Sequence, residues 1–134
     1  MKTEPEEYSY GDLVQKGRDR WNGVRNRVAQ KHIKAMKPGD GVLVYHTGKE
    51  KAIVGVAEVV SGSYLEVEEP RFATVDLEAR YALNRMVTLQ EIKAGPVFKD
   101  WELVRLPRLS VMSVSHEHWQ LTHELTGTPT CVVC

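Results

Sequence analysis

The spacing of apolar and polar residues along the chain predicts several short β-strands. Residues 41–47 and 52–60 are rich in β-branched side chains and are joined by a short turn, a pattern typical of a β-hairpin. In residues 74–80 apolar and polar positions alternate strictly, as expected for a strand with one buried face. Two further apolar runs, 103–106 and 109–114, predict one or two additional strands.

Helices are predicted where a capping residue precedes apolar residues spaced three and four apart. Three of them begin at a hydroxyl side chain, which can accept the free N–H groups of the first turn, and end at a glycine. These three run from Ser9 to Gly17, from Thr88 to Gly95 and from Ser115 to Gly127. A fourth helix begins after Asn26 and ends before the helix-breaking sequence Lys37-Pro38-Gly39-Asp40.

The order of these elements predicts the fold class. Strands that are not regularly separated by helices argue against a doubly wound parallel sheet. Short strands with helices at the periphery favour a small and strongly curved barrel instead. We therefore predict an α+β fold, built as a small curved β-barrel of five to six strands with peripheral helices.

The chain length limits the number of domains. A chain of 134 residues, of which 42% are hydrophobic, is large enough for one core and too small for two. We predict a single domain over residues 1–127, followed by a C-terminal tail over residues 128–134. The tail holds Cys131 and Cys134 in a C-x-x-C spacing, but the strand–turn–helix context of a redox site is missing, so we assign them no role.

Hydropathy gives no sign of a membrane segment. No stretch reaches the ~18 consecutive apolar residues that a membrane span requires. The first residues are polar and acidic, unlike a secretory signal. We expect a monomer that makes no use of a membrane and works in the cytoplasm, associated with the nucleoid in a bacterium, or in the nucleus of a eukaryote.

Charge is unevenly distributed, although the formal net charge is zero. Residues 16–37 contain eight Lys or Arg residues and the single acid Asp19, a net charge of +7. Such segregation is typical of a protein with one face that meets phosphates, although a solvated helix face has the same composition. The candidate phosphate-binding residues in this segment are Arg18, Arg20, Arg27, Lys31 and Lys34.

The same segment contains the sequence Trp21-Asn22-Gly23-Val24-Arg25-Asn26. An aromatic ring can stack on a nucleobase, an amide offers both a donor and an acceptor, and a guanidinium can bind a phosphate or a base edge. Gly23 lets the backbone approach a ligand closely. A buried tryptophan on a loop that leads into a helix would give the same sequence, so the hexapeptide alone leaves both interpretations open.

Signatures of an enzyme are weak. No G-x-S-x-G motif and no Gly-rich phosphate loop occurs. The residue types of an acid–base site are present at Lys2, Glu4, Arg25 and His46. Among the histidines, His116, His118 and His123 resemble zinc ligands, but His118 and His123 lie five residues apart and so on different sides of a helix. We predict no metal site and no cofactor.

Five segments, in order, resemble the EVE-domain family. They are residues 1–9 (MKTEPEEYS), 20–26 (RWNGVRN), 36–46 (MKPGD followed by VLVYH), 53–59 (IVGVAEV) and 108–111 (RLSV). Together they span nearly the whole chain. The resemblance implies a PUA-like barrel related to the YTH and SRA readers, which hold a flipped or unpaired modified base in an aromatic pocket.

The resemblance and the hexapeptide together predict a non-catalytic reader of DNA or RNA that captures a modified base, with methylation as the expected modification. Extruding a base costs a few kcal/mol, which stacking and hydrogen bonds must offset. We assign stacking to Trp21, hydrogen bonds to Asn22, Asn26 and the backbone of Gly23 and Val24, and contact with a phosphate or base edge to Arg25. An enzyme that acts on a modified base or nucleotide, and a plain protein-interaction module, are the alternatives.

The resemblance also implies which residues complete the pocket wall. These residues are Lys2, Thr3, Glu4, Tyr45, His46, Thr47 and Ser110. Several of them have a structural alternative. Tyr45 would equally suit the core, His46 a buried bond to the backbone, Thr3 and Ser110 the satisfaction of buried backbone groups, and Glu4 a solvated position.

Overall fold

The computed structural model describes residues 1–129, which form one curled sheet, a small hairpin and peripheral helices. The strands are β1 (Lys2–Thr3), β2 (Arg18–Arg20), β3 (Gly41–His46), β4 (Ala52–Val59), β5 (Tyr64–Leu65), β6 (Ala73–Thr74) and β7 (Asp76–Thr88). The helices are α1 (Tyr10–Lys16), α2 (Arg27–Ala35), α3 (Leu89–Ala94), the 3-10 helix η1 (Pro96–Phe98), α4 (Glu102–Arg105) and α5 (His116–Thr126).

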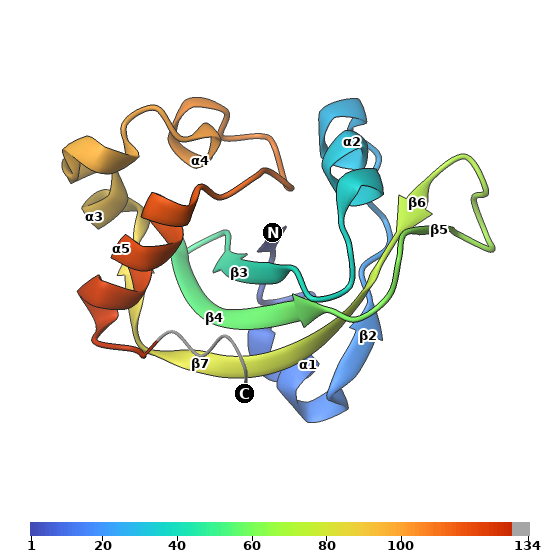
Figure 1. The fold of residues 1–134 in the computed structure, drawn as a ribbon, viewed down its shortest axis with the longest axis horizontal. Coiled ribbons are helices and arrows are strands. Elements are labelled where there is room, and N and C mark those ends of the chain that lie inside the picture. The colour runs from blue at the N-terminus through green and yellow to red at the C-terminus, as the bar shows by residue number, and fades with distance from the viewer. Residues whose placement is uncertain (130–134) are drawn as a thin grey trace.

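The main sheet has five strands in the order β1-β3-β4-β7-β2, and only β1 and β3 within it run parallel. Its pairing shifts register between Val44 and Tyr45, between Ile53 and Gly55, and between Val56 and Ala57. Bulges of this kind bend strands and increase their twist. The sheet accordingly curls into half a barrel, with α3, α4 and α5 at one end and α2 and the β5–β6 hairpin at the other (Figure 1). The predicted α+β fold with a curved sheet is confirmed.

Side chains from the sheet and the helices meet in a single core. The fully buried members include Leu13 of α1, Ile33 of α2, Val44 of β3, Ile53 of β4, Leu77 and Val87 of β7, and Ile92 of α3. One close approach fixes α1 against the sheet. A Cβ atom at Gly55 would lie 2.5 Å from the ring of Tyr10, and the Tyr10 hydroxyl donates to the Val56 carbonyl at 2.7 Å.

The predicted helix starts are confirmed at atomic detail. Ser9 and Thr88 form capping boxes with Asp12 and Glu91, so each first turn has two of its N–H groups satisfied by side chains. Asn26 accepts hydrogen bonds from the N–H groups of both Val28 and Ala29. Ser115 caps α5 in the same way, and Gly127 ends it in the left-handed conformation, with φ of 64°.

The C-terminal strands are predicted wrongly. Residues 102–105 form the short helix α4, and residues 109–114 form no strand. Val111 and Met112 are both buried, so the alternation of a half-buried strand is absent. The segment is instead held by single contacts, such as the Lys2 N–H to the Ser110 carbonyl at 2.9 Å. The predicted strand at 74–80 falls on two strands: Thr74 ends β6, and β7 begins at Asp76 and extends to Thr88.

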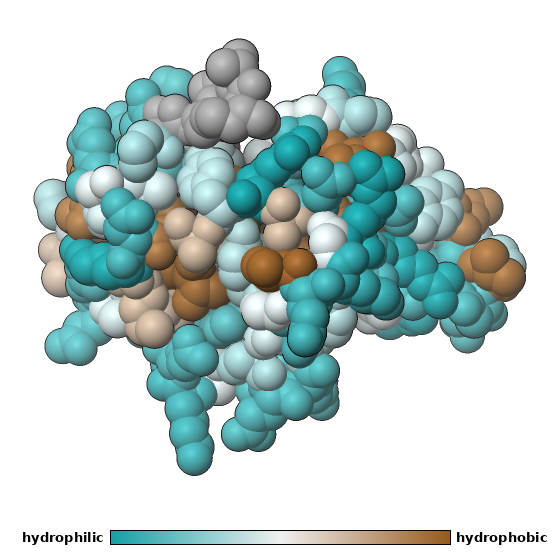
Figure 2. Space-filling view, turned by 90° about the horizontal axis from the view of Figure 1, so that it is seen from below, coloured by the Kyte–Doolittle hydropathy of each residue, from teal (hydrophilic) through white to brown (hydrophobic). Residues whose placement is uncertain are grey.

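One face of the molecule shows how polar and apolar side chains are distributed on the surface. Seen from below, the molecule is mostly hydrophilic, with hydrophobic side chains in separate patches (Figure 2). Leu65 and Val67, 58% and 81% exposed, lie in the hairpin region at one end of the molecule. Among residues 1–129, none of the helices has the length and apolar character needed to span a bilayer.

Candidate nucleic-acid interface

A cavity of about 550 Å³ opens between the first residues of the chain and the loop that connects β2 to α2. It is lined by Lys2, Thr3, Glu4, Glu7, Tyr8, Lys16, Asp19, Arg20, Trp21, Asn22, Gly23, Val24, Arg25 and Ser110. Nine of the thirteen predicted base-contacting residues are in this set, from three segments that are distant in sequence. We call it the base cavity.

Trp21 lies in the wall of the base cavity, and most of its side chain is covered by other residues. Its side chain is 9% exposed, and its backbone N–H donates to the Val75 carbonyl at 2.8 Å, beyond the end of β2. Tyr8 meets it edge to face, with ring centroids 6.0 Å apart and planes at 89°. The two rings therefore form a fixed aromatic corner at the cavity.

The Tyr8 hydroxyl points to a carboxylate. It donates to Asp19 at 2.7 Å, and Lys16 lies 3.2 Å from the same oxygen. Burial and the adjacent Asp19 raise the pKa of Tyr8 well above its usual value. Tyr8 is therefore a neutral donor at physiological pH, and Asp19 an ionised acceptor at the cavity.

The loop from Trp21 to Asn26 depends on Gly23. This residue has φ of 84°, a left-handed conformation that side chains with a Cβ adopt at a cost. Its N–H donates to Glu66 Oε2 at 3.3 Å. Glu66 is 3% exposed and follows β5 directly, so the hairpin holds the loop from behind.

Arg25 is bound to the same carboxylate. Its two terminal nitrogens donate to Glu66 at 2.9 and 3.1 Å, and these hydrogen bonds hold the pKa of Glu66 below its usual value. The guanidinium also lies over the Phe72 ring, 4.3 Å from its centroid. The Arg25 side chain remains 43% exposed, so a ligand can reach it.

A buried amide holds the far side of the loop. Gln30 of α2 is 5% exposed; its Nε2 donates to the carbonyls of Val24 and Ala73 at 2.8 and 3.0 Å, and its Oε1 accepts the Ala73 N–H at 2.8 Å. Gln30 therefore connects the loop to β6. The sequence contains no local signal for Glu66 or Gln30. The partners of Glu66 are 41 and 43 residues away, and Ala73 is 43 residues from Gln30. Only Val24 is near Gln30 in the sequence.

Four predicted contact residues lie outside the base cavity lining. Asn26 uses its side-chain oxygen to cap α2, and Tyr45 is 6% exposed within the core.

His46 accepts the Tyr10 N–H at Nε2, so its proton is on Nδ1, which faces Glu50 at 3.2 Å. Thr47 contacts two lining residues: its hydroxyl donates to Glu4 at 3.2 Å, and its backbone N–H donates to the Thr3 carbonyl at 2.9 Å.

Lys2, Thr3 and Ser110 line the cavity and also bond other parts of the chain. The Thr3 hydroxyl donates to the Tyr8 carbonyl at 2.6 Å, and the Lys2 ammonium donates to the Pro107 carbonyl at 2.8 Å. Burial lowers the pKa of Lys2. Ser110 accepts the Lys2 backbone N–H at its carbonyl, so its hydroxyl is not needed for that contact.

The predicted phosphate-binding residues fall into two groups. Arg18 pairs with Glu78 at 2.8 Å, and Arg20 with Glu68 at 3.1 Å. The second group, Arg27, Lys31 and Lys34, is exposed on α2. Within residues 1–129 no carboxylate lies within 4.0 Å of the charged groups of these three residues.

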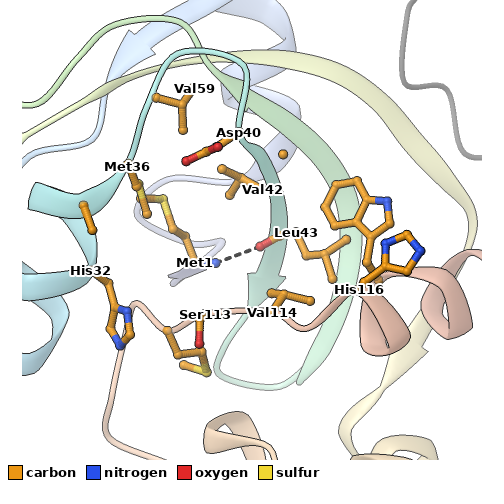
Figure 3. Close-up of a pocket in the computed structure, with 14 residues that line it drawn as sticks. Met1, His32, Met36, Asp40, Val42, Leu43, Val59, Ser113, Val114 and His116 are labelled. Atoms are coloured by element: carbon orange, nitrogen blue, oxygen red, sulfur yellow. Dashed lines mark hydrogen bonds between the residues drawn. The ribbon is translucent and has the colours of Figure 1, made fainter.

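A second cavity, of about 540 Å³, lies between α2, β3 and α5 (Figure 3). Its wall is mainly apolar, with His32 and His116 on opposite sides. The Met1 amino group donates to the Leu43 carbonyl at 2.7 Å inside it, and burial lowers the pKa of this amine to about 5. None of the thirteen predicted base-contacting residues lines this cavity.

Two of the three histidines of α5 contact other residues of the protein. His118 packs against the rings of Phe98 and Trp101, and His123 is bonded to Tyr81 at 2.8 Å. Among residues 1–129, no group of three or more His, Cys, Asp or Glu side chains is arranged to hold a metal ion. Cys131 and Cys134 lie outside the described residues.

Known proteins resemble this chain along most of its length. An uncharacterized protein of Schizosaccharomyces pombe is 32% identical over 129 residues, which cover 81% of this chain and 54% of that protein. The chain thus spans about half the length of this relative. Mouse thymocyte nuclear protein 1 is 26% identical over 164 residues, covering 96% of this chain and 73% of that protein.

Solved structures share the fold. The protein Rpa0253 from Rhodopseudomonas palustris superposes with a TM-score of 0.91 at 37% identity, covering 95% of this chain and 90% of that one. Human THYN1, solved in complex with DNA containing 5-methylcytosine, gives a TM-score of 0.87 at 25% identity, covering 97% of each chain. The family model of the EVE domain matches residues 1–125. The chain belongs to the EVE-domain family.

Proposed function

We propose that this protein binds DNA that carries a modified, methylated base and holds the extruded base in the base cavity. One observation carries the proposal: residues from positions 2–4, 21–25 and 110 converge on one cavity of about 550 Å³. This volume is within the ~300–1,000 Å³ range of ligand pockets. The human relative solved with DNA containing 5-methylcytosine supports DNA as the polymer and a methylated base as the ligand.

The base is held by stacking and by hydrogen bonds to its edge. Trp21 and Tyr8 offer the aromatic corner, and each stacked base contributes ~1–3 kcal/mol. Asn22 is exposed and offers an amide donor and acceptor. Glu4 and Asp19 line the same cavity, and carboxylates accept hydrogen bonds from an exocyclic amino group such as that of cytosine. These contacts favour an amino-bearing base.

Phosphates are bound by the basic residues around the cavity. Arg27, Lys31 and Lys34 supply positive charge that no neighbouring carboxylate within residues 1–129 neutralises. Arg18 and Arg20 contribute less, because each already holds a glutamate. The protein acts as a monomer and returns the base chemically unchanged. In a eukaryotic cell this role places it in the nucleus, and in a bacterium at the nucleoid.

A binding panel tests the proposal. The folded protein is titrated with matched oligonucleotides, single-stranded and duplex, DNA and RNA, that carry 5-methylcytosine, another methylated base or no modification. Capture of the base is followed by the quenching of tryptophan fluorescence. A Trp21→Leu variant shows how much of the fluorescence of the protein comes from Trp21. We expect tighter binding and stronger quenching with methylated DNA. Equal affinity for methylated and unmodified strands would refute the proposal.

A further inference from the structure

A third cavity, of about 390 Å³, lies next to the base cavity, between α2 and the segment that leads into β6. Arg25 belongs to the walls of both cavities. The other residues that matter here are Arg27, Lys31 and Lys34 of the α2 surface, and Arg71 and Phe72 of the hairpin turn. We call this cavity the flanking groove.

The charge of the flanking groove is concentrated on one face. Arg27, Lys31 and Lys34 are spaced four and three residues apart, so their side chains project from the same side of α2. All three are exposed. Arg71 is also exposed, and it lies 3.6 Å from Glu69 in a surface ion pair of the weak, solvated kind. The groove therefore carries positive charge that is available to an anionic ligand.

An aromatic ring lies within this charge. Phe72 is half-buried and lines the groove, with the guanidinium carbons of Arg25 and Arg71 4.3 and 5.1 Å from its centroid. Aromatic rings and arginine guanidinium groups provide surfaces on which nucleobases stack without regard to their identity. Phosphate binding alone would require no aromatic surface.

We infer that the flanking groove binds the nucleotide next to the captured base. Its base stacks on the platform formed by Phe72 and Arg71, and Arg27, Lys31 and Lys34 bind the phosphates on either side. Arg25 connects the two cavities, because it lines both. The inference rests on the proposed function, since it takes the base cavity as the place of the modified base. It adds a second nucleotide site, insensitive to base identity.

Abasic substitutions provide the test. A single-stranded DNA with one central 5-methylcytosine is prepared with an abasic nucleotide at each position from three before to three after that base. Parent protein and Phe72→Leu, which keeps an apolar side chain, are titrated with each strand. We expect one adjacent abasic position to weaken binding of the parent about tenfold, a typical loss for one stacked base. On the intact strand Phe72→Leu should lose affinity to the same degree, but on that abasic strand it should bind like the parent.

A second variant keeps the test valid if Phe72→Leu does not fold. Arg71→Gln changes an exposed side chain and should show the same coupling to the same abasic position, with a smaller loss. Independent effects of protein and DNA changes at all six positions would overturn the inference. Failure of the proposed function would give a different result. The parent would then bind strands with 5-methylcytosine and with cytosine equally, whether or not the effect of Phe72→Leu depends on the abasic position.

Discussion

Glu66 holds the guanidinium of Arg25 through two hydrogen bonds of 2.9 and 3.1 Å, although the two residues are 41 positions apart in the sequence. The same carboxylate accepts the Gly23 N–H. One buried side chain thus fixes two points of the loop that lines the base cavity. Its charge is required for this geometry, because a protonated carboxyl group accepts fewer hydrogen bonds and attracts no cation.

The stability contributed by Glu66 should depend on pH. Its pKa in the folded protein is below the ordinary value of 4.5, mainly because of the hydrogen bonds from Arg25. The contribution is therefore complete above about pH 4.5 and is lost as the pH falls through the lowered folded-state pKa. We expect the difference in unfolding free energy between the parent and Glu66→Gln to be constant from pH 7 to about 5 and to shrink below that. Urea unfolding at each pH measures it, and a difference that grows toward low pH would contradict the assignment.

Replacing Trp21 should remove discrimination between modified and unmodified bases. Because Trp21 is 9% exposed, Trp21→Ala would also leave a cavity in the core, so Trp21→Leu is the better variant. Loss of stacking should cost ~1–3 kcal/mol of affinity for the methylated strand. Trp119→Leu is the matched control, since Trp119 lines the second cavity and not the base cavity. Equal losses in the two variants would show that Trp21 acts only through stability.

Neutralising the lysines of α2 should weaken binding of every strand to a similar degree. The double variant Lys31→Gln, Lys34→Gln removes two cations that have no carboxylate within 4.0 Å among residues 1–129. Each lost phosphate contact should flatten the slope of log affinity against log salt by ~0.7–0.9. Arg18→Gln is the control, because Arg18 is paired with Glu78 and should change the slope less. An unchanged slope in the double variant would mean that the lysines only solvate the helix.

Removing the Gln30 amide should destabilise the protein and loosen the loop. Gln30→Ala leaves the Val24 and Ala73 carbonyls and the Ala73 N–H without their buried partner. Unsatisfied buried groups of this kind cost about 1–3 kcal/mol of unfolding free energy. Gln15→Ala, an exposed change on α1, should cost less than about 0.5 kcal/mol. Similar stabilities for the two variants would contradict this role for Gln30.

The captured base should be recovered intact. We expect binding of methylated DNA to be the same with and without a chelator, and mass spectrometry of the nucleosides to show the same modified base after incubation. The acid–base residue types at Glu4 and His46 make them the variants to examine. Conversion of the base by the parent, abolished in Glu4→Gln or His46→Gln, would establish an enzyme instead of a reader.

Local signals in the sequence predicted the helices well. Capping residues such as Ser9, Asn26 and Thr88 act on N–H groups two or three positions away, so their partners are visible in the sequence. The apolar run at 103–106 was misassigned because four residues are too few to distinguish a period of 2 from a period of 3.6. The run at 109–114 has strand-like composition and lies beside the edge strand β1, but β1 has only two residues and bonds the run through the single contact from the Lys2 N–H to the Ser110 carbonyl.

The candidate site was predictable only in part, because some of its contacts join residues that are distant in the sequence. Motifs identified residues 21–25, and the resemblance to a family identified Lys2, Thr3, Glu4 and Ser110, all of which line one cavity. The residues that hold the loop in place, Glu66 and Gln30, act mainly across more than 40 positions. Such contacts depend on where the β5–β6 hairpin lies relative to α2. No periodicity or motif in the chain predicts that position.

The attachment of the cavity loop to the β5–β6 hairpin affects how members of this family can diverge. Two ion pairs join this part of the chain to the hairpin: Arg20, at the end of β2, pairs with the exposed Glu68, and Arg25, in the loop, pairs with the buried Glu66. Changes at residues 66–72 are therefore expected to alter the position of the loop. Positions 67, 68, 70 and 71 are exposed, so they can vary at less cost to folding than the buried Glu66. Exchanging these exposed positions between family members would therefore test whether the turn affects the choice of ligand.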